Sequence, residues 1–376
     1  MNVETILTDA VLILPDAAVP GTLALRDGRI VEVAPGQSCA PGAVSLDGDF
    51  LLPGVIDLHT DNLERQVQPR INARWPSRSA LIAHDAQCAV AGVTTVLDAL
   101  CLGDLGFDKD RVRTFREGVA DLDALADTGL LRAVHYLHLR CEVPAPDMLG
   151  LFDPVADHPL VRMVSLMDHT PGVGQYADLD YYRRLRGKDG TTAAEIERRM
   201  AELQAQRARL RGPNRRALLD RLHGRDVAVA SHDDRTEAEI AENAADGITV
   251  SEFPVTLRAA RAAHAHGMAV IAGAPNLVRG GSHSGNVGVA ALLASGAVDA
   301  LASDYVPTSL IEAAFHPEAG PLPEAIARIT AAPARIAGLT DRGRLAPGLR
   351  ADLVRVRLHE GMPVVRAVWR AGERVA

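Results

Sequence analysis

The sequence predicts an α/β protein, a (β/α)8 barrel with a small β-sandwich domain built from both chain termini. Three observations lead to this prediction. Short apolar runs alternate with helical patterns through the middle of the chain, both ends show alternating apolar residues with turn signals, and 376 residues suffice for one large barrel with additions. We place the β domain at residues 1–52 and 345–376 and the barrel domain at residues 53–344.

The two terminal segments have the pattern of short strands. The runs "TILTDAVLIL", "GTLALRDGRIVEVAPG" and "VSLDGDFLLPG" alternate apolar and polar residues, and Asp27-Gly28 marks a tight turn. Near the other end, "ADLVRVRL" and "PVVRAVWRAGERVA" repeat this pattern. We therefore expect strands from both termini to meet in one small domain.

The central region contains eight short apolar runs that we assign to buried parallel strands, with helical patterns such as "HDAQCAVAGV" and "TLRAARAAHAHG" between most of them. A long basic helical insert separates the fourth and fifth runs. One interpretation is that this insert is simply a solvated helix. The eight runs are Val55–Leu58, Thr94–Leu97, Ala133–Leu139, Val161–Met167, Val227–Ala230, Thr249–Phe253, Ala269–Ala272 and Ala300–Ala302.

Composition and charge disfavour several classes of protein. The formal net charge is −8, whereas a general nucleic-acid binder usually carries a basic face. The four cysteines form no C-x-x-C pair, and so few in a long chain suit a reducing cytosol. The N-terminus lacks the pattern of a signal peptide, and no apolar run approaches the ~18 residues that span a bilayer. We expect a cytoplasmic protein that binds neither nucleic acid nor membrane.

Ionisable residues follow nearly every predicted strand, at the rim where barrel active sites lie. A single strand-end histidine is more often structural than a ligand. Several histidines and carboxylates converging at one rim would be costly to leave unpaired, and a divalent metal removes that cost. Imidazole suits zinc and carboxylate oxygens suit manganese. The candidate metal ligands are His59, Asp61, Glu142, His169, His232 and Asp304.

The segment "NLVRGGSHSGN" after the seventh run is a candidate phosphate site. Glycines let the backbone approach phosphate oxygens closely, and barrels often bind phosphate at this loop. A tight turn followed by a capped helix is the alternative interpretation. Arg65, Arg70, Arg140 and the basic residues of the insert are further candidates, among which the sequence does not choose. The candidate phosphate-binding residues are Arg279, Gly280, Gly281, Ser282, His283, Ser284 and Asn286.

The run "LPGVIDLHTD" behind a β segment, with "GRLAPGLRADLV" near the C-terminus, resembles the amidohydrolase superfamily over nearly the whole chain. The segments "HLRCEVP", "VSLMDHTPG", "SEFPVT", "GAPNLVRGGSHSGNV" and "ASDYVP" resemble, within it, the PhnM-type α-D-ribose 1-methylphosphonate 5-triphosphate diphosphatases of the carbon–phosphorus lyase pathway. The resemblance implies one or two divalent ions, such as zinc or manganese, and a small anionic phosphorylated sugar as substrate. It leaves open a homo-oligomer and association with other enzymes of phosphonate breakdown.

The resemblance also implies roles for the rim residues. The superfamily usually ends its first barrel strand with His-x-His, whereas this chain has His59 and Asp61, so we expect an oxygen-rich first metal site. No lysine follows a suitable strand, so Glu142 takes the place of the bridging ligand. Asp304, after the eighth strand, is expected to be both a metal ligand and the general base.

Two questions stay open at the level of sequence. His169 and His232 follow the fourth and fifth runs, whereas the family usually uses the fifth and sixth strands, so Glu252 or Asp233 is an alternative ligand. An amidohydrolase that acts on a cyclic amide, or that deaminates a nucleobase-like substrate, would use the same rim but would not need a phosphate loop. A non-catalytic barrel would usually have lost some of these ligands.

Overall fold

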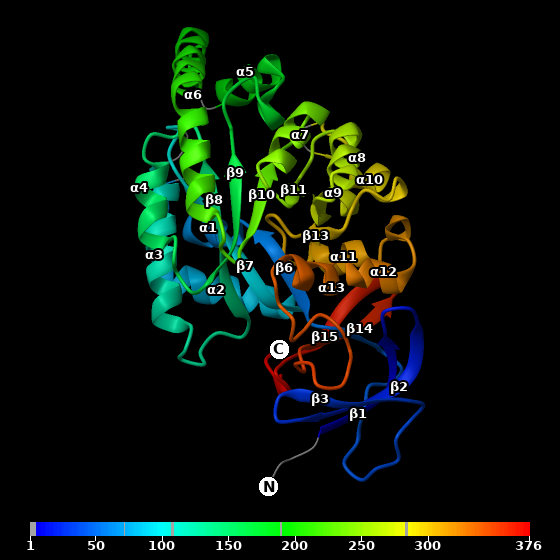
Figure 1. Cartoon of the computed structure of the whole chain (residues 1–376). Coiled ribbons are helices and arrows are strands. Elements are labelled where there is room, and N and C mark those ends of the chain that lie inside the picture. Colours follow the sequence, from blue (N-terminus) through cyan, green and yellow to red (C-terminus); the bar gives the residue numbers. More distant parts are fainter. Residues whose placement is uncertain (1–4, 71, 107–108, 189, 283–284) are drawn as a thin grey trace.

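The structure is a computed structural model that describes residues 5–70, 72–106, 109–188, 190–282 and 285–376. Its larger part is a sheet of eight parallel strands in sequence order, and a bridge between Thr60 and Asp304 joins the first strand to the segment after the last. Figure 1 shows the helices arranged around this barrel. The strands are β6 (Val55–Thr60), β7 (Val93–Leu102), β8 (Val134–Glu142), β9 (Val161–Met167), β10 (Ala228–His232), β11 (Val250–Glu252), β12 (Ala269–Gly273) and β13 (Ala300–Ala302).

All eight predicted strands are confirmed, so His169 and His232 do follow the fourth and fifth strands of the barrel. The strands are buried on both faces, as their continuous apolar runs predict. One face packs inside the barrel, with Leu58, Leu97 and Met163, and the other packs against the surrounding helices. A residue's parity along a strand therefore decides whether its side chain faces the barrel interior or the helices.

Short helices connect these strands, with one exception between β9 and β10. Turns of 3-10 helix occur at Asp153–Val155, Gly174–Tyr176 and Pro317–Ala319. No described helix combines the length and apolar character that crossing a bilayer requires. The helices are α1 (Asn62–Val67), α2 (Ser77–Val90), α3 (Lys109–Leu125), α4 (Met148–Phe152), α5 (Leu179–Gly187), α6 (Ala193–Leu222), α7 (Glu237–Ala245), α8 (Leu257–Ala265), α9 (Ala274–Val278), α10 (Val289–Ala294), α11 (Ser309–Ala314), α12 (Leu322–Ala327) and α13 (Ala331–Ile336).

A second sheet joins the two ends of the chain, as predicted. Its order is β16-β15-β14-β5-β1-β2-β3, with β4 beside β1, and its inner face has a core of its own. Asp49 accepts hydrogen bonds from Arg355 and Arg357, which fastens the N-terminal segment to the C-terminal hairpin. The division at residues 52 and 345 stays a prediction. The strands are β1 (Thr5–Ile13), β2 (Ala18–Arg26), β3 (Arg29–Pro35), β4 (Val44–Ser45), β5 (Phe50–Pro53), β14 (Leu353–His359), β15 (Met362–Arg370) and β16 (Glu373–Arg374).

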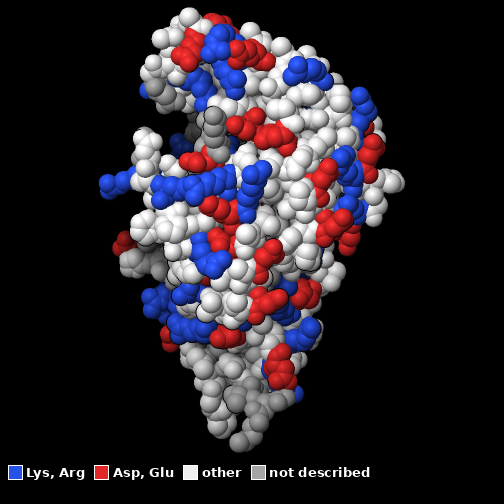
Figure 2. All heavy atoms as spheres, turned by 90° about the vertical axis from the view of Figure 1, so that its left-hand side faces the viewer, with Lys and Arg blue, Asp and Glu red and all other residues white. Residues whose placement is uncertain are grey.

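The basic insert between β9 and β10 forms α5 and the 30-residue helix α6, which rise above the barrel in Figure 1. Helix α6 is packed along one side rather than solvated all round. Its Asn214 donates to the carbonyls of Val143 and Ala145, and its Gln204 donates to the carbonyl of Pro171. These bonds tie α6 to the loops that follow β8 and β9. Figure 2 shows basic and acidic side chains interspersed on this side of the molecule.

Candidate active site

The C-terminal ends of the barrel strands open into a cavity of about 510 Å3. Because parallel strands end at the same rim, residues far apart in the sequence meet here. The structure brings together all six candidate metal ligands, since each of them lines this cavity. They are His59, Asp61, Glu142, His169, His232 and Asp304.

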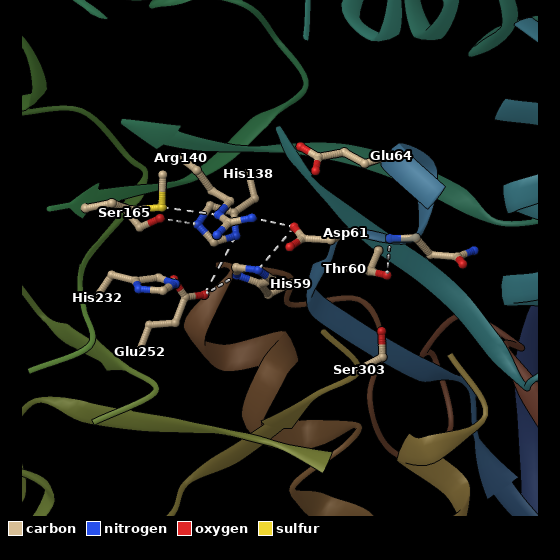
Figure 3. A network of polar contacts seen from close by, with 12 residues as sticks. His59, Thr60, Asp61, Glu64, His138, Arg140, Ser165, His232, Glu252 and Ser303 are labelled. Atoms are coloured by element: carbon tan, nitrogen blue, oxygen red, sulfur yellow. Dashed lines mark hydrogen bonds and ion pairs between the residues drawn. The ribbon is translucent and has the colours of Figure 1, made fainter. Parts of the chain in front are cut away.

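His59 sits at the end of β6, fully buried and held from behind by Glu252 of β11. The distance from His59 Nδ1 to Glu252 Oε1 is 2.7 Å, so the carboxylate orients the imidazole and favours the proton on Nδ1 (Figure 3). Nε2 then faces Asp61, 3.5 Å from its Oδ1, and makes no hydrogen bond. Although burial opposes it, the negative charge of Glu252 raises the pKa of His59 to about 10. The surroundings of this imidazole therefore favour positive charge.

The first group of possible metal ligands consists of His59, Asp61 and Asp304, whose ligand atoms all lie within 4.8 Å of one another. Arg140 of β8 forms an ion pair with Asp61 at 2.5 Å. The backbone of Asp304 has a φ of 57°, and its N–H donates to the carbonyl of His59 at 3.0 Å. Burial and the neighbouring charge of Asp61 raise the pKa of Asp304 to about 6.

The second group consists of His169, His232 and Asp233, again within 4.8 Å of one another. His232 Nδ1 lies 3.2 Å from Asp233 Oδ2, and its Nε2 is buried without a hydrogen bond. Glu142 stands beside this group, with Oε2 2.6 Å from His169 Nδ1 and Oε1 accepting from the His169 backbone N–H. The ring centres of His232 and His59 are 6.0 Å apart, so the two groups adjoin.

A divalent ion fits these residues, because it would bind buried polar atoms that have no hydrogen bond. Buried polar atoms are nearly always hydrogen-bonded, yet three atoms of the rim histidines and carboxylates are not. They belong to three residues that also form a possible ligand group, with one ligand atom of each within 4.8 Å of the others, and imidazole nitrogen with carboxylate oxygen is a common donor set for transition metals. The three atoms are His59 Nε2, His232 Nε2 and Glu252 Oε2.

Three arginines line the cavity, Arg140 from β8, Arg111 from α3 and Arg186 from α5. Arg140 was a named candidate, and Arg186 belongs to the basic insert whose residues were candidates as a group. Arg111 was missed, because nothing in the sequence of α3 marks it. Arg65 and Arg70 do not line the cavity, and Arg65 donates instead to the carbonyl of Tyr305.

The candidate phosphate loop contributes in part to the cavity. Ser282 and Asn286 line it, whereas Gly280 and Gly281 do not. Arg279 is exposed outside the cavity, with Nη1 3.5 Å from the hydroxyl of Tyr305, a lining residue. The remaining candidates, His283 and Ser284, lie outside the described residues.

A second histidine–carboxylate cluster lies on the other side of the barrel wall, between β7, β8 and α2. Asp98 accepts from His84 at 2.7 Å and from His135 at 2.8 Å, and His135 Nε2 lies 3.3 Å from Asp85. Asn62, at the start of α1, lies 3.0 Å from His84 Nδ1. The strand-end residue Asp98 therefore faces the helices and not the cavity.

Comparison with known proteins shows what the chain is similar to. No protein-family model matches the chain. The chain is 41% identical, over 98% of its length and 100% of the relative, to "Alpha-D-ribose 1-methylphosphonate 5-triphosphate diphosphatase" of Escherichia coli (strain K12). Among solved structures, an amidohydrolase aligns with a TM-score of 0.58 at 17% identity, over 99% of this chain and 98% of the other. The 5-methylcytosine deaminase of Klebsiella pneumoniae aligns with a TM-score of 0.66 at 15% identity, over 99% and 97%.

At such low identities the solved structures show the fold alone, which is the amidohydrolase fold that the sequence predicts. The E. coli relative shows more, because the alignment with 41% identity covers 98% of this chain and all of the relative. The chain belongs to the family of α-D-ribose 1-methylphosphonate 5-triphosphate diphosphatases.

Proposed function

We propose that the chain is a metal-dependent hydrolase that cleaves α-D-ribose 1-methylphosphonate 5-triphosphate to the 5-phosphate and pyrophosphate, as a step of phosphonate breakdown in the cytoplasm. The main support is that one cavity holds two adjoining groups of histidines and carboxylates together with three arginines. The name of the 41% identical relative supports the substrate. The buried free thiols of Cys88, Cys101 and Cys141 suit a reducing compartment.

We assign the metal ligands to two sites, with zinc or manganese as the ions. His59, Asp61 and Asp304 would hold one ion, and His169 and His232 would hold the other, with Glu142 between the sites. Glu252 is engaged with His59 Nδ1, so we assign it to orienting that ligand. Asp233 lies close enough to join the second site. Bound divalent ions supply a water of lowered pKa, about 7 in favourable sites, and neutralise phosphoryl charge.

The side chains of the cavity then have separate tasks in the reaction. Asp304 accepts a proton from the attacking water, while the oxygen of that water forms a bond to the α-phosphorus of the substrate. The bond from that phosphorus to the oxygen bridging to the β-phosphate breaks, and pyrophosphate leaves. Pyrophosphate is a good leaving group once cations neutralise it, so the reaction needs no strong general acid.

The loop at residues 279–286 binds phosphorus oxyanions of the substrate in this proposal. Ser282 and Asn286 reach the cavity and can donate hydrogen bonds. Arg279 lies outside the cavity, beside the lining residue Tyr305, and adds positive charge near the cavity entrance. We also assign phosphate binding to Gly280, Gly281, His283 and Ser284 of the same loop, as proposed from the sequence.

Hydrolysis of a cyclic amide, or a deamination, is the competing function, because the same metal rim can serve it. The arginines on the cavity wall argue against a neutral cyclic amide such as hydantoin, which needs no such positive charge, and the assay decides for anionic cyclic amides. The test is pyrophosphate release by protein purified with manganese or zinc, with dihydroorotate and hydantoin assayed beside the ribose triphosphate. We expect pyrophosphate release that a chelator stops. Amide hydrolysis without pyrophosphate release would leave the fold and rim intact and overturn the proposed substrate.

A further inference from the structure

We infer that Arg111 and Arg186 form a clamp that binds the pyrophosphate end of the substrate. This inference rests on the proposed function and specifies its substrate recognition. Both arginines line the cavity, but they come from helices outside the barrel strands, α3 and α5. Neither belongs to the strand-end residues or to the loop at residues 279–286.

Arg111 is positioned by a neighbour of the metal rim. Its Nε donates to Glu64 Oε2 at 3.2 Å, and Glu64 lies in α1, one turn after Asp61. The Arg111 side chain is 38% exposed, so its guanidinium is partly open to solvent and to the cavity. Because an arginine presents five N–H groups, the bond to Glu64 leaves others for a phosphate.

Arg186 is connected to the rim by a row of aromatic rings. Its guanidinium stacks over the ring of Tyr182 at 5.3 Å, and Tyr182 contacts Tyr176 edge to face at 5.5 Å. Tyr176 in turn contacts the ring of His169 at 6.0 Å and lines the cavity. Arg186, Tyr176 and Arg111 all line the same cavity.

The segments that carry the clamp are connected through α6. Arg199 of α6 donates to the carbonyl of Leu105 in the loop before α3, next to Gly106. Gly106 has a φ of 76°, which favours glycine, and a Cβ there would require the flexible Arg199 guanidinium to shift. Helices α5 and α6 share a small core of Tyr182, Ile196 and Met200. The backbone segments that carry Arg111 and Arg186 are therefore linked before any ligand binds.

The charges of the cavity assign the ends of the substrate. The substrate named by the relative has anionic groups at both ends, a methylphosphonate and a triphosphate. Ser282 and Asn286, after β12, offer only neutral donors, whereas Arg111 and Arg186 offer formal positive charge. Arg140 is paired with Asp61 beside the proposed metal ligands, whereas the pair of Arg111 with Glu64 leaves other N–H groups of a guanidinium that lines the cavity. The more highly charged pyrophosphate end is therefore assigned to Arg111 and Arg186, and the methylphosphonate end to the neutral donors.

Product inhibition tests the clamp, since pyrophosphate and ribose 5-phosphate report on different parts of the site. With the manganese-loaded enzyme, Arg186→Gln and Arg111→Gln should each weaken inhibition by pyrophosphate about tenfold, as expected for loss of one charge-assisted contact. Inhibition by ribose 5-phosphate should stay within about twofold, and KM for the triphosphate should rise more than kcat falls. Arg184→Gln, on the exposed part of the same helix, is the matched control and should change nothing.

The Glu64 pair needs its own control. Glu64→Gln removes the ion pair but keeps the Arg111 guanidinium, so it should retain most of the inhibition by pyrophosphate. Unchanged inhibition by pyrophosphate in both arginine variants would overturn the clamp even if the enzyme is an active diphosphatase. If the wild type releases no pyrophosphate, the proposed function fails instead, and calorimetric binding of pyrophosphate to the wild type and to Arg186→Gln still decides whether the clamp binds it.

Discussion

Two clusters of histidine and carboxylate lie on opposite faces of the same barrel wall, and they differ in hydrogen bonding. The outer cluster of His84, Asp85, Asp98 and His135 is fully buried, and each of its ionisable groups is hydrogen-bonded within the described structure. None of its side-chain nitrogens or oxygens appears among the buried atoms without a partner. Every buried side-chain nitrogen and oxygen of this cluster therefore has a partner without a ligand, although the ligand atoms of His84, Asp98 and His135 also lie within 4.8 Å of one another.

The inner cluster, at the rim, is made of similar residue types and is less buried, with the Asp61 side chain 19% exposed. It leaves His59 Nε2, His232 Nε2 and Glu252 Oε2 without a hydrogen bond beside a cavity of about 510 Å3. The difference teaches that residue type alone does not separate a structural cluster from a reactive one. Unused bonding capacity next to a cavity does, because an unpaired buried polar atom is costly unless a ligand meets it.

The largest effect should come from the inner cluster. Asp304→Asn keeps the size of the side chain but removes its ability to accept a proton from water. We expect kcat for pyrophosphate release to fall by about three orders of magnitude, within the range for loss of a general base combined with a weakened ligand. Thermal stability should stay near that of the wild type, since the Asp304 backbone makes the contacts that close the barrel. Turnover close to wild type would remove Asp304 from the mechanism.

Substitutions in the outer cluster should change the free energy of unfolding and not the rate of hydrolysis. Burial alone would lower the pKa of His135, but the charges and hydrogen bonds of Asp98 and Asp85 outweigh it and raise the pKa to about 9. A histidine with a raised folded-state pKa stabilises the fold fully below its unfolded value of about 6.5. That contribution, roughly 3 kcal/mol at its largest, is lost as the pH rises from about 6.5 to 9.

His135→Gln tests this linkage. The variant should unfold at lower denaturant at pH 6, and the difference from the wild type should shrink by pH 9.5. The measurement is the free energy of unfolding by urea at several pH values. His264→Gln, which removes a half-exposed histidine paired with Asp299, is the matched control and should show a smaller effect. A pH-independent difference for His135→Gln would show that the imidazole is neutral in the folded state.

The position of the rim residues could be predicted from sequence because it follows from strand topology. The C-terminal ends of parallel strands meet at one rim, so His59, Glu142 and Asp304 converge whatever the details of packing. Asp98 could not be placed in this way. The run Thr94–Leu97 ends just before it, but β7 continues to Leu102, so Asp98 lies within the strand and its parity turns it outward.

Which arginines form the cationic wall of the cavity could not be chosen from the sequence, for another reason. Arg111 and Arg186 reach the site from helices, and their direction depends on contacts such as Arg199 with Leu105 that join distant segments. Arg279 was the conspicuous basic residue in the sequence, yet it is exposed outside the cavity. The periodicity of a helix predicts which of its faces is buried, but it does not predict which polar side chain will reach the cavity at the strand ends.

Glu142 is the intermediate case between the two clusters, and it gives the smallest and most informative expected effect. It lines the cavity like a ligand, but both its oxygens are engaged with His169, as in the outer cluster. If it bridges two ions, Glu142→Gln should lower the bound metal about twofold, because a neutral amide is a poor bridging ligand. If its role is only to hold His169, the metal content measured by elemental analysis should stay at the wild-type value. Asp98→Asn is the matched control, and the comparison of the two clusters requires that it change stability without changing metal content.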